Sequence, residues 1–130
     1  MFSLLGSEET EDVVFIFLQA TGWIVVPNSR KADTMSYEFV AINERTKERA
    51  IVQVKSGGTE LDSEGWDQFR ERVFLFQAHG NYLGAPPRNV TLISPRTIER
   101  FMNSHIEIMP RTVRRWIEFA ARVRPGNGGR

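Results

Sequence analysis

Two short stretches, Tyr37-Glu-Phe-Val-Ala-Ile42 and Ala50-Ile-Val-Gln-Val-Lys55, decide the fold of this chain. Each is rich in β-branched and aromatic residues, and the polar stretch Asn-Glu-Arg-Thr-Lys-Glu-Arg joins them. This pattern predicts the two strands of a hairpin. Because side chains alternate along a strand, Gln53 and Lys55 share one face. Paired strands would also place Glu38, at the entrance of the first strand, near these two side chains.

Helical and strand-like patterns surround the hairpin. Ser7 can cap a first helix, and Trp66, Phe69, Val73 and Phe76 form a stripe at helical spacing that predicts a second long one. The predicted elements are helices over 7–21, 63–78, 95–104 and 110–123, and strands over 23–27 and 89–93. This order predicts an α/β fold with an αβββαβ core, in which helices flank a small mixed sheet and extra helices follow at the C-terminal end.

Length and composition favour a single globular domain. The chain has 130 residues, of which 41% are hydrophobic and 25% charged. We expect one domain over residues 1–124 and a flexible tail over 125–130, where Pro-Gly-Asn-Gly-Gly-Arg offers nothing to order itself. The absence of cysteine excludes disulfides, thiolate nucleophiles and cysteine-bound metals. The longest apolar run, Val13 to Leu18, is too short to cross a bilayer, and no secretory signal pattern opens the chain, so a cytoplasmic location without membrane contact is expected.

The net charge of +1 is unevenly distributed. From Pro110 onward the chain has six arginines and one acidic residue, Glu118, which gives this part a net charge of +5. Eleven basic and fifteen acidic residues in the remainder leave −4. A basic end on a mildly acidic body suits a surface that binds a polyanion, although a solvated helix face with a frayed tail would have the same composition.

The side chains predicted to meet at the hairpin suit metal-assisted phosphodiester hydrolysis. Mg²⁺ takes hard oxygen ligands, which Glu38 can supply as a carboxylate, Gln53 as an amide carbonyl and Val54 as a backbone carbonyl. A bound metal lowers the pKa of its water and stabilises charge on the phosphate. Lys55 would orient the attacking water or neutralise developing charge. Mg²⁺ is therefore the expected cofactor, with Mn²⁺ as a substitute.

These residues resemble a known family. Glu38 followed fifteen positions later by Gln53-Val54-Lys55 is similar to the motif of the PD-(D/E)XK nuclease superfamily, in the QxK form of Mrr-type restriction endonucleases. Glu11, with Gly22-Trp23 eleven positions later, resembles the first helix of archaeal Holliday-junction resolvases, whose glutamate supports the metal site. The resemblance implies a restriction-endonuclease-like core and a metal-dependent endonuclease acting on DNA, of restriction, repair or junction type. Glutamine in place of the second acid removes one negative charge, so we expect weaker metal binding.

Several alternatives stay open at this point. Asp33 is a rival first acid, Glu8 is a fallback for Glu11, and Gln53 with Lys55 could form a solvent-facing stripe on an edge strand. Further nucleic-acid contacts are expected from Ser29, Arg30, Lys31, Ser56, Arg111 and Arg115. The expected partner is double-stranded or branched DNA, with RNA as a second substrate class and a homodimer if both strands are cut. The alternative function is an inactive nuclease-fold module that binds nucleic acid or a protein partner.

Overall fold

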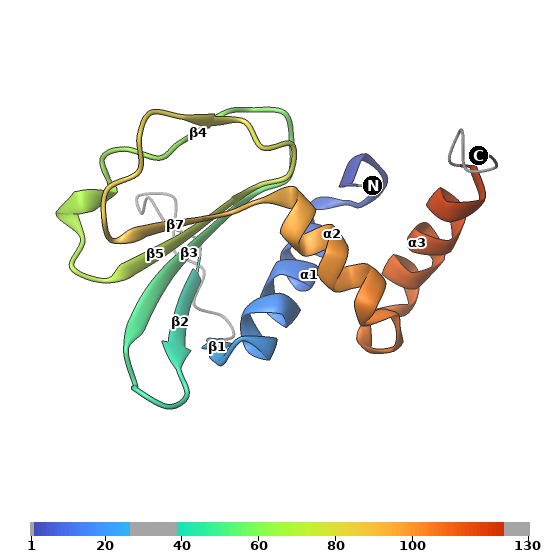
Figure 1. Ribbon diagram of the computed structural model, residues 1–130, viewed down its shortest axis with the longest axis horizontal. Coiled ribbons are helices and arrows are strands. Elements are labelled where there is room, and N and C mark those ends of the chain that lie inside the picture. Colours follow the sequence, from blue (N-terminus) through green and yellow to red (C-terminus); the bar gives the residue numbers. More distant parts are fainter. Residues whose placement is uncertain (1, 27–38, 124–130) are drawn as a thin grey trace.

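A five-stranded mixed sheet forms the centre of the fold, with helices on one face and a thin layer of short elements on the other (Figure 1). The computed structural model describes residues 2–26 and 39–123. The strand order is β1-β2-β3-β5-β7, in which β1, β2 and β3 pair antiparallel while β3, β5 and β7 pair parallel. The strands are β1 (Trp23–Val25), β2 (Phe39–Asn43), β3 (Arg49–Lys55), β5 (Arg72–Gln77) and β7 (Val90–Ile93).

The helical face holds the larger hydrophobic core. Its elements are η1 (Phe2–Leu4), α1 (Ser7–Ala20), α2 (Pro95–Ser104), η3 (Ile106–Ile108) and α3 (Arg111–Val123). Val14 of α1, Ile98 of α2 and Val113 of α3 are fully buried in one cluster with Val52 and Phe76 of the sheet. Capping differs in one detail from the sequence prediction, because Gly6 rather than Ser7 precedes α1 and its N–H donates to Glu9 Oε1 at 2.9 Å.

The opposite face is covered by the segment between β3 and β5 and by the turn after β5. These elements are β4 (Leu61–Asp62), η2 (Trp66–Gln68) and β6 (Tyr82–Leu83), and β4 pairs parallel with β6. Leu61 and Trp66 pack on Ile51, Val73 and Leu75 of the sheet and form the second core. Both faces of β3 and β5 are therefore buried, as is usual for strands inside a parallel sheet.

The predicted helix over residues 63–78 is wrong. Residues 66–68 form one short 3-10 turn and residues 72–77 form β5, so no α-helix links β3 to β5 and the αβββαβ order fails at its second helix. Trp66, Phe69, Val73 and Phe76 fit a helical stripe only by coincidence, since Trp66 and Val73 face one core while Phe76 faces the other. Because both faces of β5 are buried, the run Val-Phe-Leu-Phe lacks the polar alternation that would have indicated a strand.

Most of the other predicted strands and helices are confirmed. The hairpin pairs with Phe39 opposite Val52, and β3 ends at Lys55, before the two glycines. Strands lie within 23–27 and 89–93, and a helix covers 95–104 as predicted, while the last one begins at Arg111. Within the described residues, no helix combines the length and the apolar composition needed to cross a membrane.

Candidate functional site

The side chains of Gln53 and Lys55 lie on the sheet face away from the helices. Both alternate with Val52 and Val54, which belong to the core under α1. In the parallel ladder Gln53 pairs with Leu75 and Lys55 with Gln77, so the two side chains stand near the carboxyl ends of β3 and β5. The prediction that Gln53 and Lys55 share a face is confirmed, and β3 is an interior strand, so the edge-strand alternative is wrong.

Gln53 carries a buried polar atom without a partner. Its residue is 8% exposed, and its Oε1 accepts no hydrogen bond among the residues that the structure describes. A buried acceptor left in this state costs about 1–3 kcal/mol. Native structures keep few such atoms, and a bound water or ion is one common way in which they are satisfied.

Lys55 ends β3 and is half-buried. Its carbonyl accepts from Ala78 N at 2.9 Å, so its backbone polar groups point toward β5. Neighbouring residues of a strand direct these groups to opposite sides, so the Val54 carbonyl points toward β2. The described β2–β3 ladder ends with Phe39 opposite Val52, and the Val54 carbonyl lies beyond that last described pair.

Gln77, which the sequence analysis did not single out, lies beside Lys55 and is fully buried. Its Nε2 donates to Gly57 O at 2.8 Å and to Thr59 O at 2.7 Å. Its Oε1 accepts from His79 N at 2.7 Å and from Asn81 N at 3.1 Å. The amide of Gln77 therefore has its hydrogen bonds filled within the protein and joins the loop after β3 to the turn after β5.

Tyr82 supports the same end of the sheet. Its hydroxyl accepts from Gln77 N at 2.9 Å and donates to Ile93 O at 2.8 Å, which ties β6 to the ends of β5 and β7. Burial raises the pKa of this phenol, and the hydrogen bond from Gln77 opposes the rise. The hydroxyl therefore stays protonated and keeps its donor role at neutral pH.

Within the described part of the chain, the other side chains predicted to bind the metal do not lie on the same face as Gln53 and Lys55. Glu11 is half-buried on α1, the helix that packs on the opposite face of the sheet. Its neighbour Asp12 has a raised pKa, first because of partial burial and then because of the negative charges of Glu8 and Glu9. Across residues 2–26 and 39–123, no three His, Cys, Asp or Glu side chains come together in a way that could hold a metal. Glu38, Asp33, Ser29, Arg30 and Lys31 lie outside the described residues.

The predicted nucleic-acid contacts on α3 are accessible. Arg111 and Arg115 are exposed, as are Arg114 and Arg122. A groove of about 490 Å³ lies along this helix, lined by Glu9 of α1 and by Thr112, Arg115, Trp116, Glu118, Phe119 and Arg122 of α3. Ser56, the remaining predicted contact, directly follows Lys55 and is half-buried.

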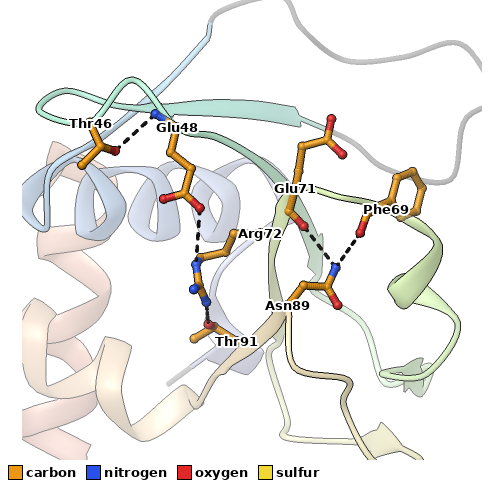
Figure 2. A network of polar contacts seen from close by, with 7 residues as sticks. All are labelled: Thr46, Glu48, Phe69, Glu71, Arg72, Asn89 and Thr91. Atoms are coloured by element: carbon orange, nitrogen blue, oxygen red, sulfur yellow. Dashed lines mark hydrogen bonds and ion pairs between the residues drawn. The ribbon is translucent and has the colours of Figure 1, made fainter.

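At the amino ends of the parallel strands, polar side chains form contacts that connect the strands and the neighbouring loop (Figure 2). Arg72 Nη1 donates to Thr91 Oγ1 at 3.0 Å, and Arg72 Nε lies 4.0 Å from Glu48 Oε2. Asn89 Nδ2 lies 3.0 to 3.2 Å from three backbone carbonyls, those of Trp66, Phe69 and Glu71, and so fixes the loop before β5. Figure 2 shows the contacts with Phe69 and Glu71. These side chains hold strands and loops to one another.

Comparison with known proteins adds no relative: no family model, curated protein or solved structure matches the chain.

Proposed function

We propose that this chain is a divalent-metal-dependent nuclease that hydrolyses phosphodiester bonds of DNA at the carboxyl end of β3. The observation that carries the proposal is the buried Oε1 of Gln53, which has no hydrogen-bond partner among the described residues and lies two residues before Lys55 on the same face of an interior strand. Ligands of open α/β sheets bind outside the carboxyl ends of the strands, and these two side chains stand near those ends. The PD-(D/E)XK-like pattern of the sequence points to the same place.

The donor atoms suit a hard cation. Mg²⁺ accepts amide and backbone carbonyl oxygens as well as carboxylates, so Gln53 Oε1 and the Val54 carbonyl would contribute two ligands. Glu38 is the carboxylate that we assign to the site, because it directly precedes Phe39, whose partner Val52 adjoins Gln53. A bound divalent ion would supply an activated water at neutral pH and neutralise charge on the scissile phosphate. Glu11 lies on α1, which packs on the opposite face of the sheet, so we do not assign it a ligand role at this site. Mn²⁺ should replace Mg²⁺.

Lys55 would act on charge that develops during the reaction. Its ammonium would hold the attacking water or stabilise the phosphate oxygens as they gain charge, which lowers the barrier more than it strengthens ground-state binding. Lys55 sits at the last position of β3, where the Ala78 N–H fixes its backbone. A side chain on a strand that is held in this way is positioned more precisely than one on a loop.

A cleavage panel tests the proposal. Purified protein should cut plasmid, linear duplex, single-stranded, flap or four-way-junction DNA with Mg²⁺ or Mn²⁺, and EDTA should abolish the reaction. Glu38→Ala should remove activity and weaken Mn²⁺ binding measured by calorimetry, with Glu44→Ala, in the hairpin turn, as the matched control. Failure to cut every substrate while duplex is still bound would support the inactive binding module. Simultaneous cutting of both strands should require a homodimer, which sedimentation would detect.

A further inference from the structure

Three consecutive carbonyl groups in the loop after Lys55 are held by side chains from the end of β5 and from the turn after it. Gly57 O and Thr59 O accept from Gln77 Nε2 at 2.8 and 2.7 Å. Gly58 O accepts from Asn81 Nδ2 at 3.3 Å. Every carbonyl of residues 57–59 is thus turned toward the protein, and the conformation of the loop is fixed by a fully buried amide.

The directions of the carbonyls determine the directions of the N–H groups. In a trans peptide the C=O of one residue and the N–H of the next point in opposite directions, and the described chain has no cis peptide. The N–H groups of Gly58, Thr59 and Glu60 therefore point away from the turn. All three residues are exposed, and within the described part of the chain these N–H groups donate no hydrogen bond.

The loop is open to a ligand and lies beside the proposed site. A Cβ placed on Gly57 or Gly58 would meet no atom within 4 Å, so the side of this backbone on which a side chain would project is open. A ligand can approach such glycine backbone closely. Gln77, which holds the loop, is the register partner of Lys55. The outward N–H groups therefore belong to the loop that directly follows Lys55, the last residue of β3.

We infer that the amide N–H groups of Gly58, Thr59 and Glu60 bind the phosphodiester backbone of a DNA strand and hold it against Lys55. This inference rests on the proposed function and names how the substrate strand is held. The carbonyls converge on Gln77, so the N–H groups fan outward and suit successive oxygens along an extended strand rather than one compact anion. Backbone N–H groups are common phosphate contacts and carry no base preference.

The test is an amide NMR titration with a short self-complementary DNA duplex in EDTA, so that no cleavage occurs. We expect the amide proton signals of Gly58, Thr59 and Glu60 to move downfield and saturate. The control is the turn at the other end of β3, where Arg45 and Lys47 carry positive charge but the N–H groups of Arg45 and Thr46 already donate to Asn43 Oδ1. Equal movement there would show charge-driven binding and overturn the inference.

A charge substitution provides a second readout. The carboxylate of Glu60 lies in the same loop and would repel a phosphate. Glu60→Gln should therefore tighten duplex binding by about two- to fivefold, as expected for one exposed charge. Glu44→Gln, in the opposite turn, should leave affinity unchanged. Unshifted loop amides in a bound complex, or unchanged affinity in Glu60→Gln, would overturn the inference even if cleavage is observed. Shifted amides in a protein that cuts nothing would support it and reject the proposed function instead.

Discussion

The two ends of the parallel strands β3, β5 and β7 differ in how their polar groups are satisfied. At the amino end, Arg72 donates to Thr91, and Asn89 lies within hydrogen-bond distance of three carbonyls, those of Phe69 and Glu71 being drawn in Figure 2. These polar side chains therefore stabilise the fold itself. At the carboxyl end, no described residue donates a hydrogen bond to the buried side-chain oxygen of Gln53 or forms an ion pair with Lys55.

The difference shows which end can accept a ligand. A polar group with filled hydrogen bonds gains little from a new partner, whereas a buried unpartnered one gains the full value of the missing bond. Gln53 and Gln77 show the same difference within the carboxyl end alone. They lie on the same face of neighbouring strands, but the described residues satisfy the side-chain oxygen of Gln77 and not that of Gln53. We interpret Gln77 as a structural residue and Gln53 as a ligand-binding one, and substitutions can separate the two roles.

Gln77→Leu should have the largest effect on stability. The substitution leaves two carbonyls and two N–H groups without the partners that the carboxamide provides. Loss of this buried network should lower the free energy of unfolding by about 3–5 kcal/mol, measured by urea denaturation. A stability within error of the parent would show that Gln77 does not hold the loop.

Lys55→Ala should reduce the cleavage rate by about a hundredfold or more, the scale of one transition-state donor. Duplex affinity measured with Ca²⁺ should change little, because one lysine is a small share of the phosphate contacts. The matched control is Arg49→Ala at the exposed start of the same strand, which should cut at the parental rate. Parental activity in a folded Lys55→Ala protein would place the active site elsewhere.

Gln53→Leu should change stability and activity in opposite directions. Leucine has a similar volume and no unpartnered oxygen, so the free energy of unfolding should rise by about 1–2 kcal/mol. Metal binding and cleavage should nevertheless be abolished, because the carbonyl ligand is gone. A stability loss like that of Gln77→Leu would mean that Gln53 is structural too and would erase the contrast between the two glutamines.

The smallest expected effect belongs to the arginines of α3. Replacing Arg111 and Arg115 with Gln should weaken duplex binding and reduce the slope of log affinity against log salt by about one unit for each phosphate that the protein no longer neutralises. The cleavage rate at saturating DNA should be unaffected, because these side chains are not assigned to the chemistry. An unchanged salt slope would assign this exposed helix face to solvent or to a protein partner.

The elements that the sequence predicted correctly keep an alternation of polar and apolar residues or have clear end signals. Alternation along β3 was enough to place Gln53 and Lys55 together, and Ser94 with Pro95 marks the start of α2. The strand β5 is buried on both faces like β3, but it carries only apolar residues between Arg72 and Gln77, so its run shows no period of two and the strand was missed.

The parts of the site that were missed depend on distant contacts. The role of Gln77 arises from hydrogen bonds to Gly57 and Thr59, about twenty positions earlier in the chain, and no local sequence pattern indicates such bonds. The position of Glu11 depends on which face of the sheet α1 covers, and helical periodicity alone does not specify that face.

The most direct test of the central claim is the ¹³C chemical shift of the Gln53 side-chain carbonyl during a Mg²⁺ titration, with the Gln77 carbonyl as an internal control. If the carboxyl end of β3 is a metal site, the Gln53 signal should move and saturate while the Gln77 signal stays in place. A Gln53 carbonyl that does not respond at Mg²⁺ concentrations that support cleavage would contradict the account and show that the metal binds elsewhere.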